Sequence, residues 1–160
     1  MARLLTEIES VTHCVTDLNR EVDAWCGWLD YELVATGNLS AELCTAWNAA
    51  ADAGLRYALL KPAGDTPTFV RFIETPQRTG YWPPVTWGWN ATEILVRDPD
   101  ALAAKLDNSP FTRFGGPGNL YMAPKAPRAI QTYAPSGAMI YFTRILPGGS
   151  RYGMKQARSP

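Results

Sequence analysis

In the sequence IESVTHCVTDLNREVDAW, residues 8–25, a strand-like run passes directly into a helical pattern. Residues 8–16 alternate and are rich in β-branched side chains, which predicts a strand. Asp17 follows as the N-cap of a helix whose apolar residues form one stripe. His13, the only histidine in the chain, lies in this strand beside Cys14. It could be a metal ligand, a catalytic base or a packed core residue.

The second half of the chain repeats this order. NATEILVR, residues 90–97, predicts a strand, Asp98 is the next N-cap, and PDALAAKLD predicts a helix with Pro99 at its first position. The two capping aspartates lie 98 − 17 = 81 positions apart, which is half of the 160-residue chain. Two βαβββ units in tandem are the simplest interpretation, and each would need its twin to close a curved sheet around a shared cavity.

The remaining patterns complete the two units. Strands are predicted at residues 31–36, 56–62, 68–75, 128–135 and 138–146, a helix at 40–54 between Ser40 and Gly54, and a strand edge with a Gly/Pro loop at 112–122. The first unit then covers residues 1–77, the linker 78–88, the second unit 89–146 and a loosely ordered polar tail 147–160. We expect these parts to form one structural domain.

Composition excludes several classes of protein. The chain is 46% hydrophobic and 19% charged, which is typical of a globular protein. Fifteen basic residues balance fifteen acidic ones, so charge does not attract the chain to nucleic acid or to an anionic membrane. No apolar stretch approaches the ~20 residues of a membrane span, and the N-terminus lacks the apolar core of a signal peptide. Three cysteines without CxxC spacing suggest reduced thiols and a cytoplasmic location.

The order, spacing and duplication of these motifs resemble the vicinal oxygen chelate superfamily, which includes glyoxalases, extradiol dioxygenases, and fosfomycin- and bleomycin-resistance proteins. The resemblance covers roughly residues 8 to 145. It rests on IESVTHCVTDLNREVDAWCGWLDYELV, RYALLKPAG, TFVRFIETP, WNATEILVRDPDALAAKL and AIQTYAPSGAMIYFTRI. It implies an α+β fold in which two tandem βαβββ modules form one cup-shaped curved mixed sheet. We expect a homodimer and a small-molecule ligand.

The resemblance also implies where a metal would be bound. In metal-using members, one ligand of each module stands seven residues before the capping Asp, and another is a Glu between two hydrophobic residues on the last strand. These positions correspond here to Ser10, Ala91, Arg71 in VRF and Tyr141 in IYF. Zinc, iron and manganese prefer imidazole, thiolate or carboxylate ligands, and a guanidinium repels the ion. We therefore expect no metal and no cofactor.

Strand parity decides between the interpretations of His13. His13 lies four residues before Asp17, whereas the ligand position lies seven before it, so the two point to opposite faces. His13 should face the helix as a packed core residue, unless a bulge reverses the parity. Cys14 shares the parity of Ser10 and Thr12 and should line the cup. A small polar lining fits Cys14 better than a nucleophile, because the chain has no second histidine to activate a thiolate.

Two charged residues are expected in the cup. Arg71 lies inside an apolar strand, where a charge is rarely buried without a partner, and Glu93 has the parity of Ala91. One interpretation is an Arg71–Glu93 ion pair that holds the structure together. The other is an anion-binding Arg71 with Glu93 as a general acid or base, and both can hold at once. Tyr141 could donate its hydroxyl to the same ligand oxygen or simply fill space.

The expected site has a catalytic part and a binding part. The catalytic residues would be Glu93, Arg71 and Tyr141, and the substrate-binding residues Ser10, Thr12, Cys14, Trp89, Ala91 and Gln131. Trp47, Trp82, Trp87 and Trp89 could wall an aromatic ligand, or be core or dimer contacts.

Three functions remain open. The first is a metal-independent enzyme of lyase, isomerase or cyclase type that acts on a small apolar or aromatic oxygen-bearing metabolite. The second is a non-catalytic binder that sequesters a drug or natural product, as resistance members of the superfamily do. The third, a metal-dependent glyoxalase-like enzyme, is disfavoured by the substituted ligand positions.

Overall fold

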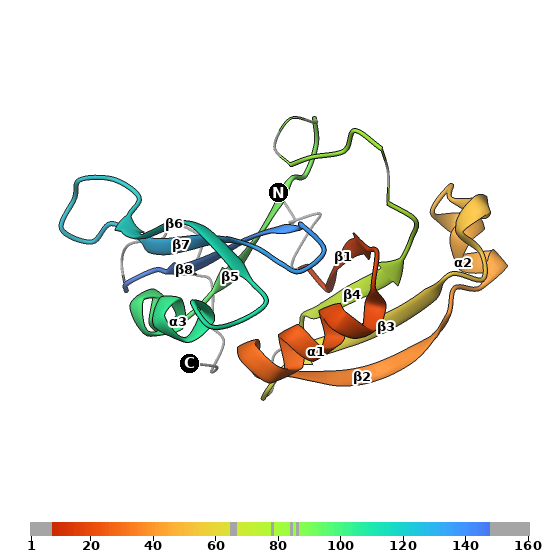
Figure 1. The fold of residues 1–160 in the computed structure, drawn as a ribbon, viewed down its shortest axis with the longest axis horizontal. Coiled ribbons are helices and arrows are strands. Elements are labelled where there is room, and N and C mark those ends of the chain that lie inside the picture. Colours follow the sequence, from red (N-terminus) through yellow and green to blue (C-terminus); the bar gives the residue numbers. More distant parts are fainter. Residues whose placement is uncertain (1–7, 65–66, 78, 84, 86, 148–160) are drawn as a thin grey trace, which may run out of the picture.

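The computed structural model describes residues 8–64, 67–77, 79–83, 85 and 87–147. The first module contains β1 (Ser10–Val15), α1 (Leu18–Leu29), β2 (Tyr31–Asn38), α2 (Ala41–Ala46), the 3₁₀ helix η1 (Ala50–Asp52), β3 (Arg56–Pro62) and β4 (Phe69–Glu74). The second contains β5 (Ala91–Leu95), α3 (Pro99–Leu106), β6 (Thr112–Asn119), β7 (Arg128–Tyr133) and β8 (Met139–Arg144). Figure 1 shows the two modules side by side, each a sheet with its own helix.

The two sheets have the same topology. Their strand orders are β1-β4-β3-β2 and β5-β8-β7-β6. In each sheet the first and last strands of the module pair in parallel, and the other neighbours pair antiparallel. The structure therefore confirms the expected α+β fold of two tandem βαβββ modules, and neither four-stranded sheet closes into a barrel.

Both long helices begin at the predicted aspartates. The Asp17 carboxylate accepts a hydrogen bond from the Arg20 amide at 3.0 Å, and that of Asp98 accepts from the amides of Asp100 and Ala101. A side-chain acceptor satisfies amides that have no partner inside the first turn of a helix. The repeat read from sequence therefore reflects a repeated capping geometry.

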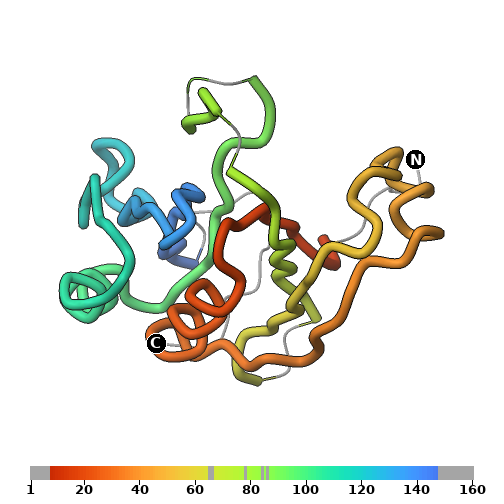
Figure 2. The backbone as a smooth tube through the Cα atoms, turned by 45° about the vertical axis from the view of Figure 1, so that its right-hand side comes forward, coloured from red at the N-terminus to blue at the C-terminus, as the bar shows by residue number. Residues whose placement is uncertain are grey.

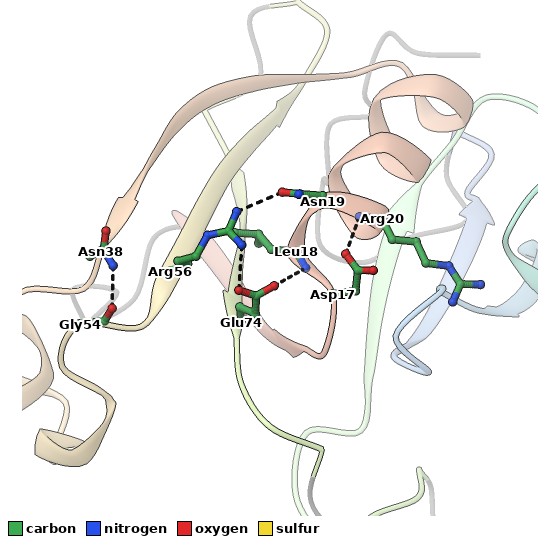
Figure 3. Close-up of polar contacts among 8 residues, drawn as sticks. All are labelled: Asp17, Leu18, Asn19, Arg20, Asn38, Gly54, Arg56 and Glu74. Atoms are coloured by element: carbon green, nitrogen blue, oxygen red, sulfur yellow. Dashed lines mark hydrogen bonds and ion pairs between the residues drawn. The ribbon is translucent and has the colours of Figure 1, made fainter.

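The start of α1 has a second acceptor that α3 does not need. Glu74 Oε1 accepts from the Leu18 amide at 3.1 Å, and its Oε2 lies 3.0 Å from Arg56 Nη1 (Figure 3). In the second module Pro99 stands at the first helical position and has no N–H to satisfy. The last residue of β8 is Arg144, so no carboxylate stands there.

One hydrophobic core includes residues of both modules. Trp25 of α1 is fully buried and packs edge-on against Tyr31 and Phe72, with ring centroids 4.9 and 5.3 Å away. Phe111, which precedes β6 of the second module, lies 6.3 Å from the same indole. The cluster continues through Leu102, Leu106, Ile130, Ile140 and Phe142. Each module thus buries apolar surface that it could not cover alone.

Polar contacts also cross between the modules. His13 Nε2 of β1 lies 3.2 Å from Thr92 Oγ1 of β5, which places these two edge strands at the seam. Glu21 of α1 accepts from the Ser136 amide in the β7–β8 turn at 3.0 Å. These contacts lie on the side of the sheets that carries α1 and α3.

Two expectations about local structure are wrong. Residues 40–54 do not form one helix: α2 ends at Ala46, and η1 follows only at Ala50. Asn48 adopts a left-handed φ of 56° between them, which an α-helix cannot contain but Asn tolerates. The Gly/Pro run of residues 112–122 is mostly strand, because β6 accommodates it through register shifts around Gly115.

The chain passes from β4 to β5 through a linker that runs out beyond the two sheets and returns (Figure 2). Its aromatic side chains are exposed, with Trp87 at 104% and Trp89 at 102%. Across the described ranges, the structure has no helix that is both long and apolar enough to cross a membrane.

Candidate functional site

The face of the sheets opposite α1 and α3 carries the candidate site. We call it the cup face and define it by Thr12, Arg71, Glu93, Tyr141 and Gln131. Strand pairing aligns them: Thr12 lies opposite Arg71 in the first sheet, while Tyr141 lies between Glu93 and Gln131 in the second. Side chains on neighbouring paired strands that share a face are close neighbours.

The seam contact links these two rows. His13 and Thr92 meet on the helix side of their strands, and adjacent residues of a strand point to opposite faces. Thr12 and Glu93, their immediate neighbours, therefore lie at the seam on the cup face, and both are exposed. The result is a polar row that runs from Arg71 through the seam to Gln131.

Glu93 and Arg71, the charged residues of the polar row, have partners that the alternation of side chains along the strands did not predict. Glu93 Oε1 accepts a hydrogen bond from Thr143 Oγ1 at 2.7 Å, and Thr143 is buried. The guanidinium of Arg71 lies over the ring of Trp47, 5.1 Å from its centroid. Within the part of the chain that the structure describes, the expected Arg71–Glu93 ion pair does not form. Arg71 stands one strand further from the seam and turns toward α2.

An aromatic cluster adjoins the polar row. Tyr133 follows Gln131 on the same face of β7, stacks on Phe114 with ring centroids 4.4 Å apart, and lies 5.4 Å from Trp82 of the linker. Phe114 and Trp82 remain 43% and 54% exposed. We call Trp82, Phe114 and Tyr133 the aromatic wall. It places exposed ring surface on the same face as Gln131 and its strand partner Tyr141.

The other predicted binding residues are distributed unevenly. Ser10 is half-buried and Cys14 is exposed, both on the cup-face side of β1, and Ala91 is exposed at the start of β5. Trp89, two residues before β5, has a fully exposed side chain, so it packs against no residue of the polar row.

Sequence reasoning missed three residues of this face. Thr143 and Tyr133 have the same parity as Tyr141 and Gln131, so extending the parity count by one step would have found them. Phe114 could not be found in this way, because the register of β6 shifts between Arg113 and Gly115.

His13 is packed on the opposite side, as parity predicts. Its ring lies 6.4 Å from that of Trp25 and 6.1 Å from that of Phe72. Burial lowers the pKa of His13 from 6.5 to about 4, so it is neutral at physiological pH. It therefore supports the seam from the core and does not face the cup.

The residues at the four metal positions do not fit a divalent ion. Ser10 and Tyr141 offer only hydroxyl groups, Ala91 offers no donor, and Arg71 is a fixed cation. Among the residues that the structure describes, no group of three or more His, Cys, Asp or Glu side chains could hold a metal ion.

Two hollows lie away from the cup face. One, of about 20 Å³, is a crevice between the modules lined in part by Trp28, Tyr31 and Lys105, which has room for a water molecule but not for a metabolite. The other is an open groove beside α1, lined in part by Asp23 and Pro110. Neither contains a residue of the polar row.

No protein-family model matches the sequence, and comparison with curated proteins finds no match. Solved structures do match. A glyoxalase family protein from Bacillus cereus has a TM-score of 0.67 and 14% identity, over 90% of this chain and 97% of that one. TnmS3, an antibiotic binding protein from Streptomyces sp. CB03234, has a TM-score of 0.62 and 17% identity, over 91% of this chain and 100% of that one.

A fosfomycin resistance protein, FosX, from Listeria monocytogenes has a TM-score of 0.60 and 9% identity, over 91% of this chain and 98% of that one. That protein was solved with Mn(II) and a dihydroxypropylphosphonic acid. At such low identities the likeness establishes the fold alone, and this fold is the one expected from the sequence.

Proposed function

We propose that this glyoxalase-fold chain binds a small aromatic, oxygen-bearing metabolite on its cup face and transfers a proton on it without a metal. The observation that carries the proposal is the pairing of Glu93 with Tyr141 on adjacent strands, beside the aromatic wall. A carboxylate base, a phenol donor and a flat apolar surface are thereby presented to one ligand.

The chemistry follows from the positions of these groups. The aromatic wall would hold the ring of the ligand, since stacked and edge-on ring contacts stabilise beyond simple area burial. Glu93 would take a proton from the carbon next to a carbonyl group, and the electron pair of that C–H bond would move to the carbonyl oxygen. Tyr141 would stabilise the enolate formed by a hydrogen bond, while Arg71, held over Trp47, would attract an anionic group elsewhere on the ligand.

The enolate then has two outcomes. Glu93 returns the proton to another carbon in an isomerisation, or the electron pair expels a group from the neighbouring carbon in an elimination of lyase type. Thr143, which donates to one oxygen of Glu93, would orient the other oxygen toward the ligand.

A second candidate function is a non-catalytic binder of a planar drug or natural product. The exposed rings of Trp82 and Phe114 favour it, since large exposed apolar groups in a cluster mark interaction sites. The similar fold of an antibiotic binding protein is compatible with it. The engagement of Arg71 by Trp47 also fits a rigid binding surface.

Exchange of α-tetralone hydrogens in heavy water separates the two functions. This probe has an aromatic ring, a carbonyl group and acidic hydrogens on the adjacent carbon. Faster exchange at that carbon with protein than with buffer supports the enzyme. Binding of the probe with exchange at the buffer rate supports the binder. Absence of both binding and exchange, with β-naphthoate also unbound, contradicts the aromatic-ligand proposal.

A further inference from the structure

Gln131 lies flat against the neighbouring strand instead of projecting from the sheet. It pairs with Gly115 of β6, and an added Cβ at Gly115 would overlap Gln131 Oε1 and lie 3.2 Å from its Cδ. The carboxamide therefore occupies the space that any other residue at position 115 would fill. Because Gly115 has no side chain, the side chain of Gln131 can lie against β6.

The backbone does not require glycine at this position. The left-handed region is occupied by Gly116, with φ of 75°, whereas Gly115 is not among the positive-φ glycines. Alanine would fit the main chain at position 115, and the conflict would be with the end of a flexible side chain. Glycine at position 115 therefore provides space for the Gln131 side chain and is not needed for the backbone conformation.

The first module shows the contrast. There Leu59 of β3 pairs with Arg71 as Gln131 pairs with Tyr141, so Leu59 is the equivalent of Gln131. The residue opposite Leu59 on β2 is Ala35, which does have a Cβ. The second module combines a longer polar side chain on the cup face with a glycine beside it. Gln131, its partner Tyr141 and Tyr133 of the aromatic wall share one face, so a carboxamide that lies against Gly115 does not project over these two rings.

We infer that Gly115 is a positioning residue that sets ligand specificity, because it keeps the Gln131 carboxamide flat and so leaves room for a fused aromatic ring on the cup face. The inference rests on the proposed function. A Cβ at position 115 pushes the carboxamide into that space. Ligands with two fused rings then lose contact, and single-ring ligands lose much less.

The test compares Gly115→Ala with Gly118→Ala. Gly118 lies on the same strand, and an added Cβ there meets nothing within 4 Å, which makes it a matched control. Affinities for β-naphthoate and benzoate are measured by titration calorimetry. Gly115→Ala should weaken β-naphthoate binding by roughly fivefold to a hundredfold, the range expected for overpacking, with a smaller loss for benzoate. Gly118→Ala should bind both as the unmodified protein does.

A double variant distinguishes a positioning role of Gly115 from general damage to the binding surface. The double variant Gly115→Ala/Gln131→Ala removes the displaced carboxamide and should restore β-naphthoate binding to within about threefold of Gln131→Ala alone, because the two effects act through one contact. Equal losses for both ligands, tighter β-naphthoate binding, or failure of the rescue would overturn the inference.

A ligand-free measurement separates this inference from the proposed function. The side-chain amide resonances of Gln131 in a nitrogen–proton correlation spectrum should shift in Gly115→Ala and stay in place in Gly118→Ala. Unshifted resonances overturn the positioning of Gln131 by Gly115. Shifted resonances in a protein that binds neither ligand confirm the positioning and count against the proposed function and the specificity role that rests on it.

Discussion

His13 Nε2 on β1 and Thr92 Oγ1 on β5 lie 3.2 Å apart and join the first strands of the two modules. The contact places Thr12 and Glu93 on the opposite side of the same seam. The geometry of the cup face therefore depends on packing behind it, where a half-buried, neutral imidazole packs against Trp25 and Phe72.

Acidification should destabilise the protein through His13. Its folded pKa of about 4 lies below its ordinary value of 6.5, so the unfolded chain binds the proton more readily. Stability is lost as pH falls from about 6.5 toward 4, by an amount on the order of 1–3 kcal/mol. Urea unfolding of the native protein and of His13→Gln across this range measures it, and the variant should show a smaller pH slope. Equal slopes would contradict the buried neutral imidazole.

The contribution of Glu21 to the pH dependence of stability should have the opposite sign to that of His13. Glu21 is buried, accepts from Trp25 Nε1 and the Ser136 amide, and has a pKa raised mainly by desolvation. The folded state therefore holds this proton more tightly, and stability associated with Glu21 decreases as pH rises through its folded pKa. Glu21→Ala should cost about 3 kcal/mol or more at neutral pH, because it leaves a cavity and two unsatisfied donors.

A matched control for Glu21 is Glu42, an exposed carboxylate in the first turn of α2. Glu42→Ala should change the free energy of unfolding by no more than about 0.5 kcal/mol. Urea midpoints report both variants. A Glu21→Ala protein as stable as Glu42→Ala would show that the link between α1 and the β7–β8 turn is dispensable.

Arg71 should select for anionic ligands. Its removal in Arg71→Ala should weaken β-naphthoate binding by roughly tenfold to a hundredfold, the usual range for a hydrogen bond to a charged group. Uncharged naphthalenemethanol should lose little. Trp47→Leu, which removes the ring beneath the guanidinium, should cost about twofold to fivefold. Arg20→Ala, on the far side of α1, is the control, and equal losses for the charged and uncharged ligands would exclude a charge-based role.

Much of the fold was predictable because it rests on local signals. Asp17 and Asp98 cap helices at equivalent places, and strand parity correctly directed His13 to the helix side. The break of the 40–54 helix was not predictable, since it depends on a single left-handed residue, Asn48. The path of β6 was obscured by glycines that have no intrinsic strand preference.

The candidate site was predictable only in part. Parity identified the face of Arg71 and Glu93 but not their distances from the seam, which depend on strand order. It could not indicate that Trp47, from a short helix after β2, would hold Arg71. Such contacts arise from tertiary packing between segments that share no local pattern.

Hydrogen exchange into α-tetralone measures directly whether Glu93 transfers a proton. The rate at the carbon beside the carbonyl is followed by proton NMR in heavy water, with the native protein, Glu93→Gln and the control Glu32→Gln. Glu32 is an exposed carboxylate of β2 paired with Lys61. If Glu93 is the base, catalysed exchange falls by about a hundredfold or more in Glu93→Gln and is unchanged in Glu32→Gln. Exchange by a folded Glu93→Gln protein at the native rate would contradict this role of Glu93.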